Sequence, residues 1–245
     1  METVSSLCDD GGDVSERPSK ERVKRPGERL RAHQAGDPMG VDALLVELDV
    51  VGRWRAAHAA PLTRVAANLR YYVAEASGGF FVVGQRLKRM ETIRDKLDRE
   101  PQMVLSRMHD IAGARAVLAG EDAVDRVLGR LREQRRWELM PRTWDYVAHP
   151  KPDGYRAKHL VVRKDGVLIE VQLRTASQHA WAELVEQLDR DHGLQLKAGR
   201  AAPEVTAILR RASATFAQLE AGELDRTATL KRIGELLGEL PKGRR

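Results

Sequence analysis

The sequence contains a single cysteine, Cys8, among 245 residues. One thiol excludes an internal disulfide framework and a thiolate metal cluster, and it fits a reducing compartment. The sequence also has no run of about 18 apolar residues, the length that spans a membrane. Its first residues lack the charged and then apolar pattern of a signal peptide. We therefore expect a soluble, cytoplasmic protein that has no membrane partner.

Positive charge is in modest excess, with 42 Lys and Arg against 36 Asp and Glu and a net charge of +6. A basic balance favours polyanionic partners such as nucleotides, phosphates or RNA, although a solvated basic surface needs no partner at all. A chain of 245 residues can build one sizeable core, or a core domain with helical extensions.

Three regions differ in composition. Residues 1–40 have few large apolar side chains, so we expect this segment to be disordered or partly helical. Residues 41–195 are expected to form the core domain, and residues 196–245 are expected to form a C-terminal helical extension. The cationic face of this extension is either solvated or a contact surface for tRNA or another partner. Apolar spacing predicts helices at residues 41–58, 61–72, 123–134, 178–188, 203–220 and 224–240.

Two apolar-rich runs separated by residues 164–166 predict a β-hairpin, because Asp165-Gly166 supplies the positive φ of a tight turn. Alternation along the second strand gives it one apolar and one polar face. The apolar face holds Val167, Ile169, Val171 and Leu173, and the polar face holds Glu170, Gln172 and Arg174. The polar face is either the solvated side of an antiparallel sheet or a surface that presents chemistry.

Residues 84–100 combine an apolar stripe at helical spacing with six cations, and the stripe predicts a helix. The stripe consists of Leu87, Met90, Ile93 and Leu97, and the cations are Arg86, Lys88, Arg89, Arg94, Lys96 and Arg99. Such a cluster of cations is either an ordinary solvated helix face or a site for phosphate groups.

The run from Asp110 to Arg115 predicts a helix end that passes through Gly113 into a strand at residues 115–119. Asp110 at the mouth of this strand is either a capping residue or, together with Glu170, a carboxylate pair of the kind that magnesium uses. The remaining strands are predicted at residues 137–140, 157–163 and 167–174.

Three segments around the hairpin carry a resemblance to a known family. They read Asp145-Tyr-Val-Ala-His-Pro-Lys-Pro-Asp-Gly-Tyr-Arg-Ala-Lys-His159, Glu170-Val-Gln-Leu-Arg-Thr175 and His179-Ala-Trp-Ala-Glu183. Together with the upstream runs 86–99 and 110–115, they make residues 41–195 resemble the synthetase domain of RelA/SpoT proteins. The resemblance implies an α+β fold, with a mixed five-stranded sheet flanked by helices and similar to nucleotidyltransferases. It also implies an enzyme that transfers the β,γ-pyrophosphate of ATP to the 3′-hydroxyl of GDP or GTP.

The resemblance also implies roles for single residues. Those that would hold the adenine and phosphates of ATP are Arg86, Lys88, Lys96, Arg99 and Arg115. Those that would bind the acceptor nucleotide are Lys151, Tyr155, His159, Gln172, Arg174 and His179. Asp110 and Glu170 would hold Mg²⁺, and Glu170 could instead accept the proton of the attacking hydroxyl. From the residues alone, Tyr155 could equally be a core residue, His159 a strand residue with satisfied hydrogen bonds, and His179 with Glu183 a structural pair.

Two departures from the family bear on function. His109-Asp110 lacks the remainder of the His-Asp motif of the family's hydrolase domain, so we predict no hydrolysis. Ala157-Lys158 replaces the family's serine after Gly-Tyr-Arg, and this change and the cationic C-terminal region favour the toxin branch, which places pyrophosphate on the 3′ end of tRNA. A third hypothesis is an inactive module that binds a nucleotide or an antitoxin protein. A homo-oligomer is compatible with each hypothesis.

Overall fold

In a computed structural model, the described residues are 17–192, 196 and 201–241, and they form two compact units. The first unit contains the described part of Met1–Ala59 together with Leu87–Met108, and the second contains Ala60–Arg86 and the chain from His109 onward. Each unit is therefore built from two separate stretches of the chain. The domain boundaries that we expected after residues 40 and 195 stay predictions.

The first unit is helical. It consists of α1 (Lys20–Gln34), α2 (Val41–Ala56), α4 (Met90–Arg99) and the short 3-10 turn η1 (Leu105–Arg107). Helix α1 begins after Ser19, whose side chain accepts a hydrogen bond from the amide of Arg22 at 3.1 Å. Its apolar residues Val23 and Leu30 are buried, as are Ile93 and Leu97 of α4. Helix α1 lies within residues 1–40, the segment that we expected to be disordered or partly helical.

Arg31 fixes the end of α4 within the first unit. Its guanidinium donates to the carbonyl oxygens of Leu97 at 2.8 Å, Pro101 at 2.8 Å and Met103 at 2.5 Å. The last carbonyls of a helix lack intrahelical partners, so a side chain that satisfies them stabilises the helix end. The C-terminal turn of α4, which carries Lys96 and Arg99, is therefore anchored to α1.

The second unit contains a five-stranded sheet with the order β1-β2-β5-β4-β3. Strands β2 and β5 are parallel, whereas β4 runs antiparallel to both β5 and β3. The strands are β1 (Phe81–Leu87), β2 (Ala112–Leu118), β3 (Glu138–Asp145), β4 (Lys158–Lys164) and β5 (Val167–Thr175). This arrangement confirms the predicted mixed sheet of five strands.

Strand β1 corrects the prediction for the segment that begins at Gly84. We expected Arg86 on a helix, but it lies on β1, and α4 begins only at Met90. The preceding residues Phe80 to Val83 are aromatic and β-branched, which favours extended backbone. We had counted Leu87 as the first apolar residue of the helix. The helix in fact begins about one turn later, at Met90.

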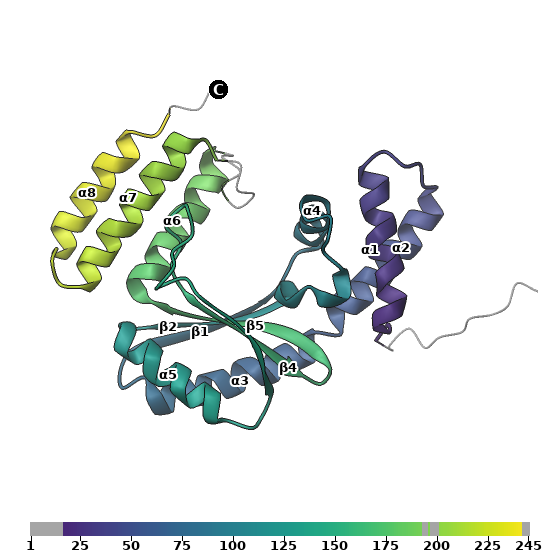
Figure 1. The fold of residues 1–245 in the computed structure, drawn as a ribbon, viewed down its shortest axis with the longest axis horizontal. Helices are drawn as coiled ribbons and strands as arrows, with labels where there is room; N and C mark the ends of the chain where they lie inside the picture. The colour runs from purple at the N-terminus through teal and green to yellow at the C-terminus, as the bar shows by residue number, and fades with distance from the viewer. Residues whose placement is uncertain (1–16, 193–195, 197–200, 242–245) are drawn as a thin grey trace, which may run out of the picture. The chain divides into compact units, whose positions relative to one another are not determined.

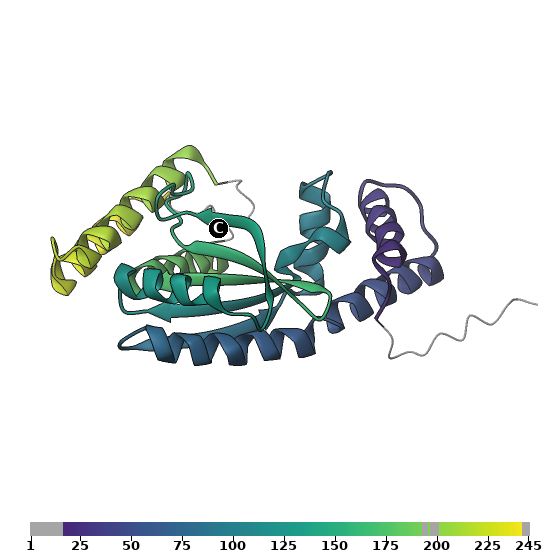
Figure 2. The ribbon, with the colours of Figure 1, turned by 60° about the horizontal axis from the view of Figure 1, so that its bottom comes forward.

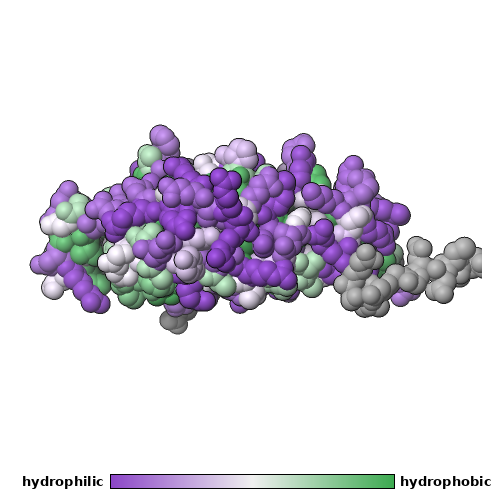
Figure 3. All heavy atoms as spheres, turned by 90° about the horizontal axis from the view of Figure 1, so that it is seen from below, coloured by the Kyte–Doolittle hydropathy of each residue, from purple (hydrophilic) through white to green (hydrophobic). Residues whose placement is uncertain are grey.

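Helices cover the two faces of the sheet differently. Helices α3 (Ala59–Ala76) and α5 (Glu121–Glu133) lie against one face, and α6 (Ala176–His192) leaves from the other (Figures 1 and 2). The outward surface of α3 and α5 is mostly hydrophilic, as Figure 3 shows. Their inward residues and the apolar face of β5 make the main core of this unit. The opposite face of β5, on the side of α6, carries the polar residues.

The C-terminal helices α7 (Pro203–Glu220) and α8 (Arg226–Gly238) match the two helices predicted there. They pack with α6 around a second apolar core that includes Trp181, Leu209 and Ile233. The indole nitrogen of Trp181 donates to the carbonyl oxygen of Leu209 at 2.9 Å, which ties α6 to α7. None of the helices in the described ranges is long and apolar enough to cross a membrane.

The turn between β4 and β5 has the backbone that its sequence predicts. Asp165 and Gly166 have φ values of 50° and 76°, so both central residues lie in the left-handed region. Lys164 then faces Val167, and the same register carries through to Lys158 opposite Leu173. This register decides which side chains of the two strands share a face.

We predict opposite effects of two glycine-to-alanine substitutions. Gly166→Ala places a side chain in the left-handed region and should destabilise the fold by about 1–2 kcal/mol. Gly129→Ala, within α5, should stabilise it by about 0.5–1 kcal/mol, because a Cβ there meets no atom within 4 Å. Urea denaturation of both variants measures the difference. A Gly166→Ala protein as stable as the wild type would contradict the assignment of the turn.

Candidate active site

Five polar side chains from β4, β5 and the loop before β4 form a closed ring of hydrogen bonds, here called the polar ring. Glu170 accepts from Nδ1 of His159 at 2.9 Å and from Nε2 of Gln172 at 2.6 Å. Arg174 donates to Oε1 of Gln172 at 2.9 Å and to the hydroxyl of Tyr155 at 2.7 Å. That hydroxyl lies 2.6 Å from Nε2 of His159 and closes the ring. The structure thus brings together five of the residues singled out in the sequence.

The polar ring follows from strand alternation and register. Glu170, Gln172 and Arg174 are spaced by two residues, so their side chains leave β5 on the same side. His159 of β4 lies directly opposite Gln172 in the antiparallel pair. Neighbouring side chains on one face of such a pair lie within contact distance. The predicted polar face of β5 is therefore a connected network rather than a row of separate solvated groups.

The hydrogen bonds define how the polar ring is protonated. They are all satisfied when Nδ1 of His159 donates to Glu170 and Nε2 accepts from the hydroxyl of Tyr155. Burial acts to raise the pKa of Glu170, but the hydrogen bonds from His159 and Gln172 outweigh it, and they lower this pKa to about 2 when His159 also carries a positive charge. Burial raises the pKa of Tyr155, despite the nearby charge of Arg174. Glu170 is therefore an anion and Tyr155 a neutral hydrogen-bond donor.

Asp110 lies close enough to Glu170 for the two carboxylates to interact. It stands in the short turn η2 (His109–Ile111) just before β2, and Gly113 of β2 is paired with Glu170 of β5. Its negative charge acts to raise the pKa of Glu170. Across the described residues, no three His, Cys, Asp or Glu side chains are grouped as metal ligands. Two carboxylates suit magnesium, which takes one or two from the protein and completes its shell with water and substrate phosphate oxygens.

The guanidinium group of Arg115 lies within electrostatic reach of two others, those of Arg174 and Arg86. Burial and the positive charges of Arg174 and Arg86 lower the pKa of Arg115, although Glu183 partly offsets them. Arg115 contacts Nδ1 of His179 at 3.3 Å and a carboxylate oxygen of Glu183 at 3.4 Å. Mutual repulsion among cations destabilises the charged state, so the arrangement favours the binding of an anion.

His179 and Glu183 share a helix face, as their spacing predicts. Nδ1 of His179 lies 3.7 Å from the Glu183 carboxylate, and both side chains are partly exposed in the N-terminal half of α6. Burial and the charge of Arg115 lower the pKa of His179, against the opposing effect of Glu183. A neutral imidazole beside a guanidinium accepts a hydrogen bond, which is the role that His179 has here.

The loop between β3 and β4 brings Lys151 and Tyr155 together. The ammonium of Lys151 lies over the ring of Tyr155, 4.8 Å from its centroid, and over that of Tyr146 at 4.7 Å. The guanidinium of Arg174 lies 5.0 Å from the centroid of Tyr155. The ring of Tyr155, which we predicted to bind the acceptor nucleotide, is therefore covered by cations through cation–π contacts, which a stacked base would replace.

The predicted phosphate-binding residues divide between the two units. Arg86 and Arg115 belong to the second unit, whereas Lys88, Lys96 and Arg99 belong to the first. Within the first unit, the backbone oxygen of Lys88 accepts from Nε of Arg55 at 2.6 Å. Lys96 and Arg99 lie in the last turn of α4.

Lys158, one of the two departures from the family pattern, does not face the polar ring. Its ammonium contacts Asp125 of α5 at 2.6 Å and Asp145 at 3.5 Å, and it leaves β4 on the side opposite to His159. Consecutive residues of a strand point to opposite faces, which explains the difference. Ala157 is fully buried, and its carbonyl accepts from the amide of Tyr146 at 2.9 Å. The departure at these two positions therefore adds no cation to the polar ring.

Sequence reasoning missed two residues that shape this site. The ring of Tyr146 packs edge-on against Tyr155 and His159, with centroids 5.8 and 5.2 Å away. Its place beside Asp145 in the resembling segment could have identified it. Ser213 of α7 donates to the carbonyl oxygen of Gly154 at 2.5 Å. No local pattern marks Ser213, because its partner lies 59 positions away.

Comparisons with known proteins identify the family of this chain. A family model described as a region found in RelA/SpoT proteins matches residues 85–189. The GTP pyrophosphokinase YjbM of Bacillus subtilis is 31% identical over 151 residues, which cover 57% of this chain and 68% of that protein. The chain belongs to the RelA/SpoT family. The probable GTP diphosphokinase RSH3 of Arabidopsis thaliana, a chloroplastic protein, is 31% identical over 126 residues, and this RelA/SpoT chain covers only 17% of its length.

Solved structures of family members share the fold of this RelA/SpoT protein. The small alarmone synthetase 2 from Bacillus subtilis superposes with a TM-score of 0.58 at 23% identity, covering 69% of this chain and 93% of that chain. The small alarmone synthetase 1 from the same organism, bound to its product pppGpp, gives a TM-score of 0.56 at 24% identity over 77% of this chain and 98% of that chain. The predicted mixed sheet with flanking helices is thereby confirmed.

The low pKa of Glu170 predicts how stability depends on pH. Its folded pKa of about 2 lies below its ordinary value of 4.5, so its stabilising effect is complete above pH 4.5 and is lost as the pH falls toward 2. The free energy of unfolding of the wild type should exceed that of Glu170→Gln by an amount that shrinks over this range, on the order of 3 kcal/mol in total.

Urea titrations at several pH values measure this difference. Glu138→Gln is the control for net charge, because it removes an exposed carboxylate at the first residue of β3, outside the polar ring. A difference between the wild type and Glu170→Gln that stays constant from pH 5 to pH 3 would contradict the predicted coupling to His159 and Gln172.

Proposed function

We propose that this protein is an ATP-dependent pyrophosphokinase that transfers the β,γ-pyrophosphate of ATP to the 3′-hydroxyl of GDP or GTP and so makes (p)ppGpp. The observation that carries the proposal is the gathering of Arg86, Arg115 and Arg174 on the sheet face that also holds the carboxylates of Asp110 and Glu170. Membership of the RelA/SpoT family supports it, as do the GTP pyrophosphokinase names of several relatives.

On the donor side, we assign ATP to the guanidinium cluster. Arg115 and Arg86 repel one another electrostatically in the unbound protein, and a triphosphate removes this repulsion. Planar guanidinium groups bind phosphate oxygens in pairs and can lie on a purine face. The roles that the family resemblance implies for Lys88, Lys96 and Arg99 stay predictions.

Asp110 and Glu170 are the residues that we assign to Mg²⁺. Each oxygen of Glu170 holds one hydrogen bond from the polar ring and retains a further lone pair. When bound there, Mg²⁺ would neutralise negative charge on the phosphates of ATP. Within the polar ring, His159 and Gln172 orient the carboxylate of Glu170, as groups behind metal ligands commonly do.

On the acceptor side, we assign the nucleotide to Tyr155 and its neighbours. A guanine on the ring of Tyr155 would replace a cation–π contact by base stacking, and Lys151 would then be available for phosphate. Nε of Arg174 is buried without a hydrogen-bond acceptor among the described residues. A buried donor of this kind is costly unless a ligand oxygen satisfies it.

In the proposed reaction, the 3′-hydroxyl of the acceptor attacks the β-phosphorus of ATP. The bond from the acceptor oxygen to the β-phosphorus forms, the bond from the β-phosphorus to the oxygen that it shares with the α-phosphate breaks, and AMP leaves. The hydroxyl proton passes to solvent. A carboxylate with a pKa of about 2 is a weak proton acceptor at neutral pH, so we assign Glu170 to holding the ion rather than to general base catalysis. Catalysis then arises mainly from alignment and charge neutralisation.

We predict that the purified chain transfers labelled pyrophosphate from ATP to GDP or GTP. Thin-layer separation of the products after incubation with GDP, GTP or deacylated tRNA identifies the acceptor. Transfer to tRNA alone would replace the proposed acceptor by the tRNA 3′ end. Transfer to none of the three would contradict the enzymatic proposal and leave a nucleotide-binding module.

We predict that Glu170→Gln lowers the transfer rate by at least about 100-fold while it leaves the dissociation constant for ATP nearly unchanged. The reason is that the substitution removes the charge that holds the ion but keeps the shape of the side chain. The matched control is Glu138→Gln, whose exposed carboxylate pairs with Arg163 at 3.1 Å. A transfer rate for Glu170→Gln within twofold of the wild type would remove Glu170 from the mechanism.

A further inference from the structure

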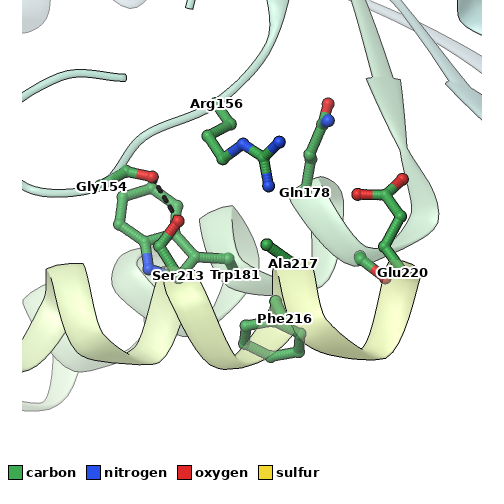
Figure 4. Close-up of a pocket in the computed structure, with 9 residues that line it drawn as sticks. Gly154, Arg156, Gln178, Trp181, Ser213, Phe216, Ala217 and Glu220 are labelled. Atoms are coloured by element: carbon green, nitrogen blue, oxygen red, sulfur yellow. Dashed lines mark hydrogen bonds between the residues drawn. The ribbon is translucent and has the colours of Figure 1, made fainter. Parts of the chain in front are cut away.

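The loop that carries Lys151 and Tyr155 is held from outside by the C-terminal helix α7. The hydroxyl of Ser213 donates to the carbonyl oxygen of Gly154 at 2.5 Å, as Figure 4 shows, and Ser213 is buried. Helix α7 is itself tied to α6 through the hydrogen bond from Trp181 to Leu209. Since α6 continues directly from β5, the strand of the polar ring and the support for the loop belong to one connected structure.

Gly154 permits this close approach. Its φ of +91° lies in the left-handed region, and a Cβ there would lie 2.7 Å from Cβ of Ser213 and 3.0 Å from Cα of Arg210. The backbone of the loop is thus in direct contact with the surface of α7. Any side chain at position 154 would push the loop and the helix apart.

Within the loop, three hydrogen bonds transmit the position of Gly154 to the residues on either side. The amide of Gly154 donates to the carbonyl oxygen of Lys151 at 2.8 Å, and the amide of Lys151 donates to that of Tyr155 at 3.2 Å. Asp153 accepts from the amide of Tyr155 at 3.0 Å. The ring of Tyr155 also packs against the core formed by α6, α7 and α8, 6.1 Å from Trp181 between centroids.

We propose that Ser213 is a positioning residue for the acceptor nucleotide. Its hydrogen bond to Gly154 holds the loop in the one conformation in which Tyr155 joins the polar ring and Lys151 lies over the ring of Tyr155. The C-terminal helices thereby become part of acceptor recognition and leave the donor site unaffected. That the loop binds an acceptor nucleotide rests on the proposed function. That Ser213 holds the loop in place rests on the hydrogen bonds described above.

The test uses Ser213→Ala in the full chain, with two readouts. In the transfer assay, we expect the KM for the acceptor to rise about 3- to 10-fold, the effect of losing one buried hydrogen bond that orders a binding loop. The KM for ATP and kcat should stay within twofold of the wild type. In hydrogen exchange followed by mass spectrometry, the amides of residues 151–155 should exchange at least about threefold faster.

Thr215→Val is the matched control, because it removes another buried hydroxyl of α7. The hydroxyl of Thr215 donates within the helix, to the carbonyl oxygen of Arg211 at 3.1 Å. This variant can lower the melting temperature as Ser213→Ala does, but it should change neither the KM for the acceptor nor the exchange of residues 151–155. If both variants change these quantities equally, Ser213 is merely structural and the inference is overturned.

The remaining outcomes separate this inference from the proposed function. Unchanged exchange of residues 151–155 in Ser213→Ala, or an unchanged KM for the acceptor, overturns the positioning role while wild-type transfer stands. A wild type that transfers to no acceptor refutes the proposed function and the role in acceptor binding with it. The exchange comparison still decides in that case whether Ser213 holds the loop.

Discussion

The polar ring is the interaction on which the rest of the site depends. It joins a carboxylate, an imidazole, a phenol, a guanidinium and an amide, and each accepts or donates where its neighbour requires. A buried polar network is stabilising only when its members are satisfied, because an unpaired group in a low-dielectric environment is costly. The hydrogen bonds of the ring therefore fix five side chains in one arrangement before any ligand binds, and they leave Nε of Arg174 without an acceptor among the described residues. Preorganisation of this kind is what electrostatic catalysis requires.

The ring also sets the charge pattern around it. It keeps Glu170 ionised beside Asp110, and it holds Arg174 close enough to Arg115 for the two cations to repel. The two neighbouring carboxylates repel each other, and so do the two neighbouring guanidinium groups. Both repulsions make this face electrostatically unfavourable when no ligand is bound. A ligand that carries several negative charges together with a divalent cation would relieve both repulsions at once. This complementarity, more than any single residue, is the physical reason for assigning a magnesium nucleotide to this face.

Much of this arrangement could be predicted from the sequence, because it is local. The Asp165-Gly166 turn sets the register of the hairpin, and alternation then places Glu170 and Gln172 on one face. Alternation also places Lys158 on the face of β4 opposite to His159. Strand β1 was missed because its last residues were grouped with the helical stripe that follows, although its aromatic and β-branched start favours a strand.

Contacts between segments far apart in the chain could not be predicted in this way. The hydrogen bond from Ser213 to Gly154 joins α7 to a loop 59 positions earlier, and neither residue type marks the pair. From the residues alone, the pairing of Asp110 with Glu170 was one of two alternatives, and the parallel pairing of β2 with β5 supplies its physical cause. Likewise, the clamp by Arg31 at the end of α4 depends on the packing of the first unit.

The most direct test of the account is the position of a divalent ion. Crystals grown with Mn²⁺ and a non-hydrolysable ATP analogue allow the ion to be located by anomalous scattering. The account predicts a single strong peak at about 2 Å from a carboxylate oxygen of both Asp110 and Glu170, with the polar ring intact behind Glu170. A peak that contacts neither carboxylate, while the analogue is bound to the guanidinium cluster, would contradict it.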